Sequence, residues 1–79
     1  MCVVGARNRD QCQALCDLSD YCEAWTYNLN RQLCFFKKRH GWTATDSYGF
    51  DSGFKNQGPW YDPNTDFVGG IYCCDNHIG

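Results

Sequence analysis

The spacing of apolar residues predicts a short helix near the N-terminus. Cys12, Leu15 and Cys16 recur at the i, i+3 and i+4 positions that form one face of a helix. Asp10 stands just before this run, and Gln13 follows three residues later, so we expect the Asp10 carboxylate to accept the free amides of the first turn. The predicted helix covers residues 11 to 18. Because so short a helix is unstable alone in water, other contacts must hold it.

A different pattern begins at Tyr21 and predicts a hairpin. Residues 21 to 27 and residues 32 to 38 are rich in aromatic and β-favouring side chains, as strands are. Asn28–Arg31 forms the turn between them, since Asn tolerates left-handed backbone angles. Cys22 and Cys34 then lie on adjacent strands, and both can face the helix.

The remaining chain is expected to alternate loops and strands. A loop containing Gly41 follows the basic residues 37 to 40, and a strand lies around residues 46 to 51. Gly58-Pro59 and Asp62-Pro63 break regular structure, so residues 56 to 66 are expected to be a loop. Residues 67 to 74 are the last strand candidate, although Gly69-Gly70 weakens it.

Composition places this pattern in a small disulfide-rich domain. The chain has 79 residues, enough for one domain over residues 1–79, and seven of them are cysteine. That cysteine content is typical of extracellular domains whose core is too small to hold them folded. Aromatic residues make up 16% of the chain and supply much of the apolar area.

Charge and hydropathy exclude two classes of partner. A net charge of −2 and a pI near 5.4 argue against nucleic-acid binding, which normally requires a basic excess. No stretch is long and apolar enough to span a membrane. Met1 is followed at once by Cys2, without the parts of a signal peptide, so we expect the mature part of a secreted precursor.

Neither a metal site nor catalysis is expected. Cys73, Cys74 and His77 could ligate zinc, but the paired Cys-x2-Cys ligands of zinc sites are absent. The acidic and amide residues of segment 62–66 begin like a calcium loop, but the later ligand positions do not match. His40 and His77 are the only histidines, and Ser52 does not lie in a nucleophile elbow. We therefore predict no enzyme activity and no cofactor.

Two exposed-looking segments are the candidate binding residues. The basic run Lys37, Lys38, Arg39 is followed by Trp42 and could hold a sulfated glycan or an acidic protein surface. Trp60 and Tyr61 lie between prolines and form an aromatic loop suited to contacts. The alternatives are a solvated strand end for the first segment and mutual ring packing for the second.

The cysteine-containing segments resemble the PAN/Apple family. The resemblance rests on Cys12-Gln-Ala-Leu-Cys16, then Cys22-Glu-Ala-Trp-Thr-Tyr-Asn28, then Cys34-Phe-Phe-Lys37, and on Asp51-Ser-Gly-Phe-Lys55. It covers roughly residues 9–55 and leaves residues 56–79 as a C-terminal loop and strand. It implies an α+β fold in which one helix packs across a curved antiparallel sheet.

The same resemblance implies the disulfide pairing. By position, Cys12 pairs with Cys34 and Cys16 pairs with Cys22, and Apple-type members add a bridge between the termini, here Cys2 with Cys73 or Cys74. One cysteine is left over, which suggests an interchain bridge, a free thiol or a buried thiol beside its bridged neighbour.

One departure from the family concerns its N-terminal strand, which is usually longer than the segment before Cys12 allows. Asn64–Gly70 resembles an element of that strand and is a candidate to fill its position, in the same chain or in a neighbouring one.

These observations predict a non-catalytic extracellular module for adhesion or recognition, which contacts proteins or carbohydrates through its sheet face and loops. The alternative is a structural subunit that assembles into an extracellular filament or sheath through the C-terminal segment and the odd cysteine.

Overall fold

The structure, a computed structural model, describes residues 3–71 of the chain. The helix α1 spans Arg9–Leu18, close to the predicted range, but its cap differs from the prediction. The Oδ1 atom of Asn8, not the Asp10 carboxylate, accepts from the Gln11 amide at 2.8 Å. The Gln11 side chain in turn accepts from the Arg7 amide at 2.6 Å. The first bond satisfies an amide that the first turn leaves free, and the second ties the residue before the cap to the helix. The helix thus begins two residues earlier than expected.

The predicted hairpin forms the centre of an antiparallel sheet. Strand β2 (Ala24–Asn28) pairs with the first part of β3 (Leu33–Asp46), and Tyr27 lies opposite Cys34. β4 (Phe50–Phe54) lies on the other side of β2, and the short β1 (Val3–Gly5) lies on the other side of β3. The Asn28 side chain accepts the amides of Asn30 and Arg31 and closes the turn.

The second half of the chain departs from the predicted pattern. β3 does not end near residue 38 but continues through the expected loop to Asp46, with Gly41 at a φ of 95°. An irregularity in register between Lys37 and Trp42 lets the strand bend, and its last part pairs with β5 (Thr65–Ile71). β4 accordingly starts at Phe50 rather than near residue 46. The last strand begins two residues before the predicted start, and residues 72–74 of the predicted strand lie outside the described residues.

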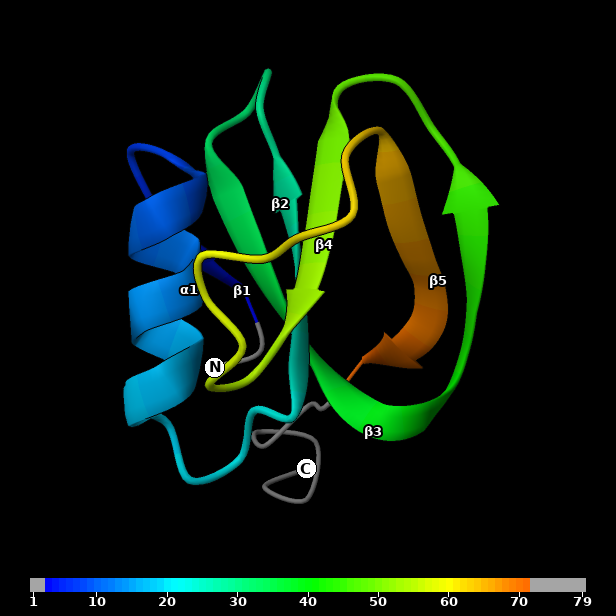
Figure 1. Cartoon of the computed structure of the whole chain (residues 1–79). Coiled ribbons are helices and arrows are strands. Elements are labelled where there is room, and N and C mark those ends of the chain that lie inside the picture. Colours follow the sequence, from blue (N-terminus) through cyan, green and yellow to red (C-terminus); the bar gives the residue numbers. More distant parts are fainter. Residues whose placement is uncertain (1–2, 72–79) are drawn as a thin grey trace, which may run out of the picture.

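The position of β5 bears on the prediction that segment 64–70 fills the place of the N-terminal strand. The segment pairs with residues 37 and 42–46 of β3 in its own chain. The prediction that it fills the place of the N-terminal strand in its own chain is therefore wrong, because β1 holds residues 33–35 of β3 and β5 pairs with a different part of that strand. Figure 1 shows β5 beside the bent end of β3, far from α1.

The face of the sheet toward α1 carries the disulfide core. Cys12 is bonded to Cys34, and Cys16 to Cys22, which is the pairing that the resemblance implies. Cys22 itself lies just before β2 rather than within it. All four cysteines of these two disulfides are fully buried.

Trp25 and Tyr27 point from β2 into the same core. The Tyr27 hydroxyl donates to the Ala6 carbonyl at 2.7 Å, and burial raises the pKa of this phenol above its ordinary value of 10.0.

The opposite face of the sheet is covered by β5. The edge of β5 that does not pair with β3 forms hydrogen bonds with side chains of the sheet. The Thr26 hydroxyl accepts from the Phe67 amide at 3.2 Å. The Ser52 hydroxyl donates to the Thr65 carbonyl at 2.7 Å, and the Lys37 ammonium donates to the Gly69 carbonyl at 3.1 Å. Thr26, Ser52 and Lys37 are all buried. These polar residues therefore replace a neighbouring strand and satisfy backbone groups that would otherwise be buried unpaired.

Candidate binding surface

A stack of aromatic rings extends from the core to the surface beside the end of β4. Trp42 lies flat on Phe67, with ring centroids 3.9 Å apart and planes inclined by 11°. Phe54 lies 5.8 Å from Trp42 and 5.9 Å from Trp60. Phe67 is 1% exposed, whereas Trp60 is 50% exposed. Trp60 is therefore the outermost ring of the stack, and the rings behind it limit its movement.

An open groove lies beside Trp60. It has a volume of about 580 Å³ and is lined by Phe54, Lys55, Gln57 and Trp60. The Lys55 ammonium donates to the Ser19 carbonyl at 2.6 Å, and since an ammonium has three donors it can still bind a ligand. The groove thus combines ring faces with an amide and a cation, a lining that suits an amphipathic ligand.

Two residues of the basic run lie near this groove. Lys38 and Arg39 are exposed, and the Lys38 carbonyl accepts from the Trp42 indole at 2.8 Å. The Arg39 guanidinium lies 3.5 Å from the Glu23 carboxylate, and the Glu23 carbonyl accepts from the Lys55 amide. These contacts place the backbone of Lys38 and the guanidinium of Arg39 at the same end of the molecule as the aromatic stack.

Lys37 and Trp42 differ from the other predicted binding residues. Lys37 is only 4% exposed, and its ammonium faces the Gly69 carbonyl inside the fold, so its charge is not at the surface with that of Lys38. Trp42 is half-buried, and Phe67 covers one face of its ring. The ring that remains available for stacking on a ligand is Trp60.

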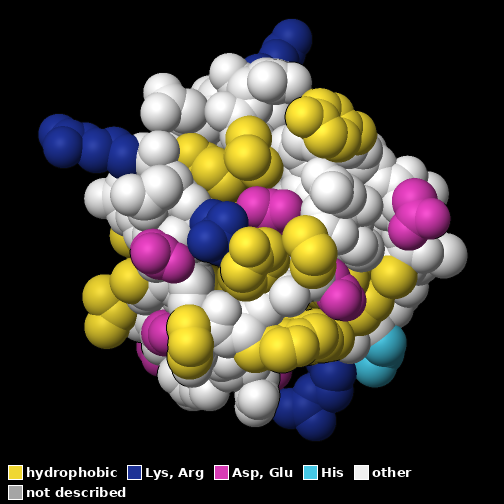
Figure 2. Space-filling model, turned by 45° about the horizontal axis from the view of Figure 1, so that its top comes forward, with side chains coloured by type: hydrophobic (Ala, Val, Ile, Leu, Met, Phe, Trp, Pro, Cys, Tyr) yellow, Lys and Arg dark blue, Asp and Glu magenta, His cyan; other side chains and the backbone are white. Residues whose placement is uncertain are grey.

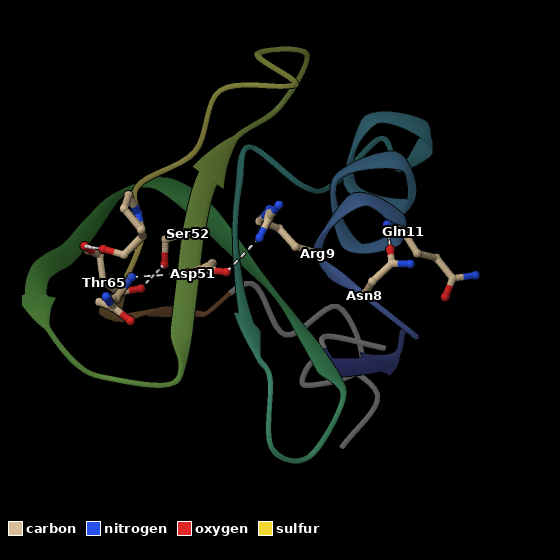
Figure 3. A network of polar contacts seen from close by, with 8 residues as sticks. Asn8, Arg9, Gln11, Asp51, Ser52 and Thr65 are labelled. Carbon is tan, nitrogen blue, oxygen red and sulfur yellow. Dashed lines mark hydrogen bonds and ion pairs between the residues drawn. The ribbon is translucent and has the colours of Figure 1, made fainter.

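Tyr61 is held in the fold by Arg9. Arg9 projects from α1 toward β4, and its guanidinium lies 3.1 Å from the buried Asp51 carboxylate (Figure 3). The same guanidinium lies 3.7 Å above the Tyr61 ring. Asp51 also accepts from the Asn64 amide at 3.2 Å. Tyr61 thus packs between α1 and the loop, and the predicted pair of loop aromatics divides into an exposed ring and a half-buried one.

The surroundings of the rings are mixed in character. Figure 2 shows hydrophobic side chains in a broken band across one face, with Lys and Arg side chains both among them and at the margin, and with Asp and Glu side chains between them. The chain has a net charge of −2, so its basic residues act locally and not as a general positive field.

Sequence reasoning missed three residues of the groove: Phe54, Lys55 and Gln57. The loop after β4 folds back by hydrogen bonds from the Gln57 amide to Phe54 and from the Trp60 amide to Gln57, at 3.3 and 3.0 Å. A cation and an amide a few positions before an isolated Trp are the only signal in the sequence. The turn that gathers them depends on tertiary contacts.

The described residues give little support to a metal site. Among residues 3–71, no three His, Cys, Asp or Glu side chains lie close enough together to hold a metal ion, and Cys73, Cys74 and His77 lie outside this range. The backbone of Asp62 pairs with Ser52, and the amide of Asn64 bonds to Asp51, so this part of the calcium-like segment is tied to β4.

No helix in the described part of the chain has the length and apolar character needed to cross a membrane.

Comparison with known proteins identifies the family. Neither curated proteins nor solved structures gave a match. The family description of the PAN domain matches residues 2–57, which is most of the chain and includes the four cysteines of both observed disulfides. Helix, sheet and disulfides agree with the α+β fold of that family. The chain belongs to the PAN domain family.

Proposed function

We propose that this domain is a non-catalytic extracellular recognition module that binds glycans through the groove beside Trp60. PAN domains are in general binding modules for proteins or carbohydrates in extracellular proteins. The two buried disulfides fit an oxidising compartment, because such bonds are rare where thiols are kept reduced.

The half-exposed ring of Trp60 is the observation that carries the proposal. A pyranose ring has an apolar face, and packing it on an aromatic ring buries apolar surface of both. Phe54 supports Trp60 from behind, so little side-chain freedom is lost on binding. Gln57 and Lys55 supply hydrogen bonds at the margin of the same groove.

The nearby cations favour acidic sugars. Lys38 and Arg39 are exposed at this end of the molecule, and charged hydrogen bonds to sulfate or carboxylate groups are stronger than neutral ones. Arg39 shares its charge with Glu23 only across a solvent-exposed pair, which contributes little and is easily exchanged for a ligand. We therefore expect sulfated glycans to bind more tightly than the same glycans without sulfate.

The test is calorimetric titration of the chain with sulfated and desulfated oligosaccharides of one backbone, selected on a glycan array. Trp60→Ala should weaken binding about tenfold or more, since one stacked ring contributes on the order of 1–2 kcal/mol. Tyr48→Ala is the matched control, because Tyr48 is 92% exposed and lies before β4, at the strand end opposite the groove. Equal losses in both variants, or no binding to any glycan, would refute the proposal.

A further inference from the structure

One edge of the sheet lacks a neighbour. β2 pairs with β3 only as far as Lys37, and β5 pairs with the other edge of β3 between Trp42 and Asp46. Within residues 3–71, segment 42–46 therefore has a strand on one side only. Figure 1 shows this end of β3 at the outer margin of the molecule, with β5 on its inner side.

The backbone of this segment points its hydrogen-bonding groups outward. The amide of Phe67 and the carbonyls of Thr65 and Gly69 bond to side chains of the sheet, so these positions face away from β3. In an antiparallel pair, a residue opposite such a position also turns its backbone groups away from the partner strand. Trp42, Ala44 and Asp46 occupy those opposite positions. Their amides and carbonyls are consequently available to a further strand.

Side-chain burial also ends abruptly at this edge. Ala44 lies opposite Phe67, which is 1% exposed, yet Ala44 itself is exposed, as are its neighbours Thr43 and Thr45. Proteins commonly protect such edges with lysine, proline or a bulge, but segment 42–46 contains neither lysine nor proline, and its register with β5 is regular.

We propose that a second copy of this chain pairs antiparallel with this edge and forms a continuous β5–β3–β3–β5 sheet across a two-fold axis. If Thr43 lies opposite its own copy, Trp42 faces Ala44, and the outward backbone groups of both strands meet. The same register places the basic run that ends at His40 beside Asp46 of the other copy. Opposite charges thus meet at both ends of the paired segment, and Thr–Thr contacts form at its centre.

This interface is distinct from the groove beside Trp60. The groove is lined by residues of β4 and the loop after it, and the pairing segment contributes none of them. The dimer would carry two copies of the groove on one rigid particle, which strengthens attachment to a repetitive ligand. Loss of the dimer should leave the affinity of a single groove for a short oligosaccharide without sulfate unchanged, because the basic run, which lies beside the interface, bears only on acidic sugars.

The test is sedimentation equilibrium of the full chain, from about 1 μM to about 1 mM, with any free thiol alkylated so that interchain disulfides do not contribute. The wild-type chain should show a reversible monomer–dimer equilibrium. Ala44→Lys places like charges near the two-fold axis and should raise the dimer dissociation constant at least about tenfold. Asp46→Lys should also weaken the dimer, because it replaces the negative charge beside the basic run of the other copy with a positive one.

Ala14→Lys is the matched control, because Ala14 is an exposed alanine on α1 and the change adds the same charge. It should leave the dissociation constant within about twofold of the wild-type value. A wild-type chain that stays monomeric over the whole range would overturn the proposal. So would an equal effect of Ala44→Lys and Ala14→Lys.

Discussion

Gly53 shows how closely single residues are fitted on the α1 side of the sheet. It lies opposite Trp25 on the neighbouring strand, and a Cβ atom at this position would come within 2.5 Å of the Trp25 ring. Trp25 is 1% exposed, and its Nε1 atom is the one buried side-chain nitrogen or oxygen without a hydrogen-bond partner among the described residues. The ring is thus held by packing alone, and that packing requires glycine at position 53.

Replacing Gly53 with Ala should therefore destabilise the fold. We expect a loss of about 1–3 kcal/mol in the free energy of unfolding, because the ring must shift against bonded cysteines and strands that cannot move with it. Gly5→Ala is the control, since no atom outside the adjacent residues lies within 4 Å of a Cβ built at Gly5. Urea denaturation with intact disulfides measures both. A Gly53→Ala variant as stable as Gly5→Ala would show that the Trp25 ring has room to move.

At the level of elements, β5 is attached to the sheet through side chains as well as through a strand partner. Its outer edge pairs with β3, and its inner edge bonds to Thr26, Ser52 and Lys37. The Thr26 and Ser52 hydroxyls also lie 2.8 Å from each other. This small polar network lets β5 cross the sheet face without leaving backbone groups unpaired.

Thr26→Val tests this network, because valine keeps the shape of threonine but removes the hydroxyl. The buried Phe67 amide would lose its acceptor, and we expect the free energy of unfolding to fall by about 1–3 kcal/mol. Hydrogen exchange of the Phe67 amide should accelerate together with this loss. Thr43→Val changes an exposed threonine of β3 in the same way and should have almost no effect on the free energy of unfolding of the monomer. An unchanged exchange rate at Phe67 in the Thr26 variant would contradict the assigned role.

The length of β3 was the feature of the fold that the sequence predicted least well. Residues 38–46 are nearly all exposed, so they carry no alternating apolar pattern, and the polar run around Gly41 favoured a loop. What makes this segment a strand is its pairing with β5, a long-range contact that no local signal records. β2 was predictable, because both of its faces are buried and its aromatic and β-branched residues run nearly without interruption.

For the whole molecule, the arrangement along β3 brings the two ends of the described chain together. Val3 lies opposite Phe35 and Ile71 opposite Lys37, while β2 occupies the other edge at both positions. Val3 and Ile71 thus follow one another along one edge of β3, about 7 Å apart by the rise of a strand. Cys2 and Cys73 lie within two residues of these positions in the sequence.

We therefore predict a third disulfide that joins Cys2 to Cys73 or Cys74. Its separation in sequence is nearly the whole chain, so closing this loop should stabilise the fold by about 4–5 kcal/mol on the chain-entropy estimate. Peptide mapping of the non-reduced, alkylated protein should recover the pair as one cross-linked fragment, with label on the remaining cysteine. Label on Cys2 in the folded monomer would contradict the prediction. The bonds Cys12–Cys34 and Cys16–Cys22 serve as internal controls in the same digest.

The candidate surface was predictable only in part. The sequence pointed to Lys38, Arg39 and Trp60, and all three are exposed. It grouped Lys37 with the first two, but strand alternation turns Lys37 inward to the Gly69 carbonyl. It also paired Trp60 with Tyr61, whose ring Arg9 covers. Adjacent residues in a strand or a loop point in different directions, so neighbours in sequence did not remain neighbours on the surface.

The amino-acid sequence by itself determined the local features of this protein, the helix and the central hairpin, while its resemblance to a known family implied the two bridges. The helix and the hairpin depend on side-chain periodicity and on short separations along the chain, which a sequence records directly. Only the tertiary structure decided where β3 bends, what covers the second face of the sheet, and which rings reach solvent. Those outcomes depend on contacts between β5 and residues up to 41 positions away, and their energies exist only once the chain is folded.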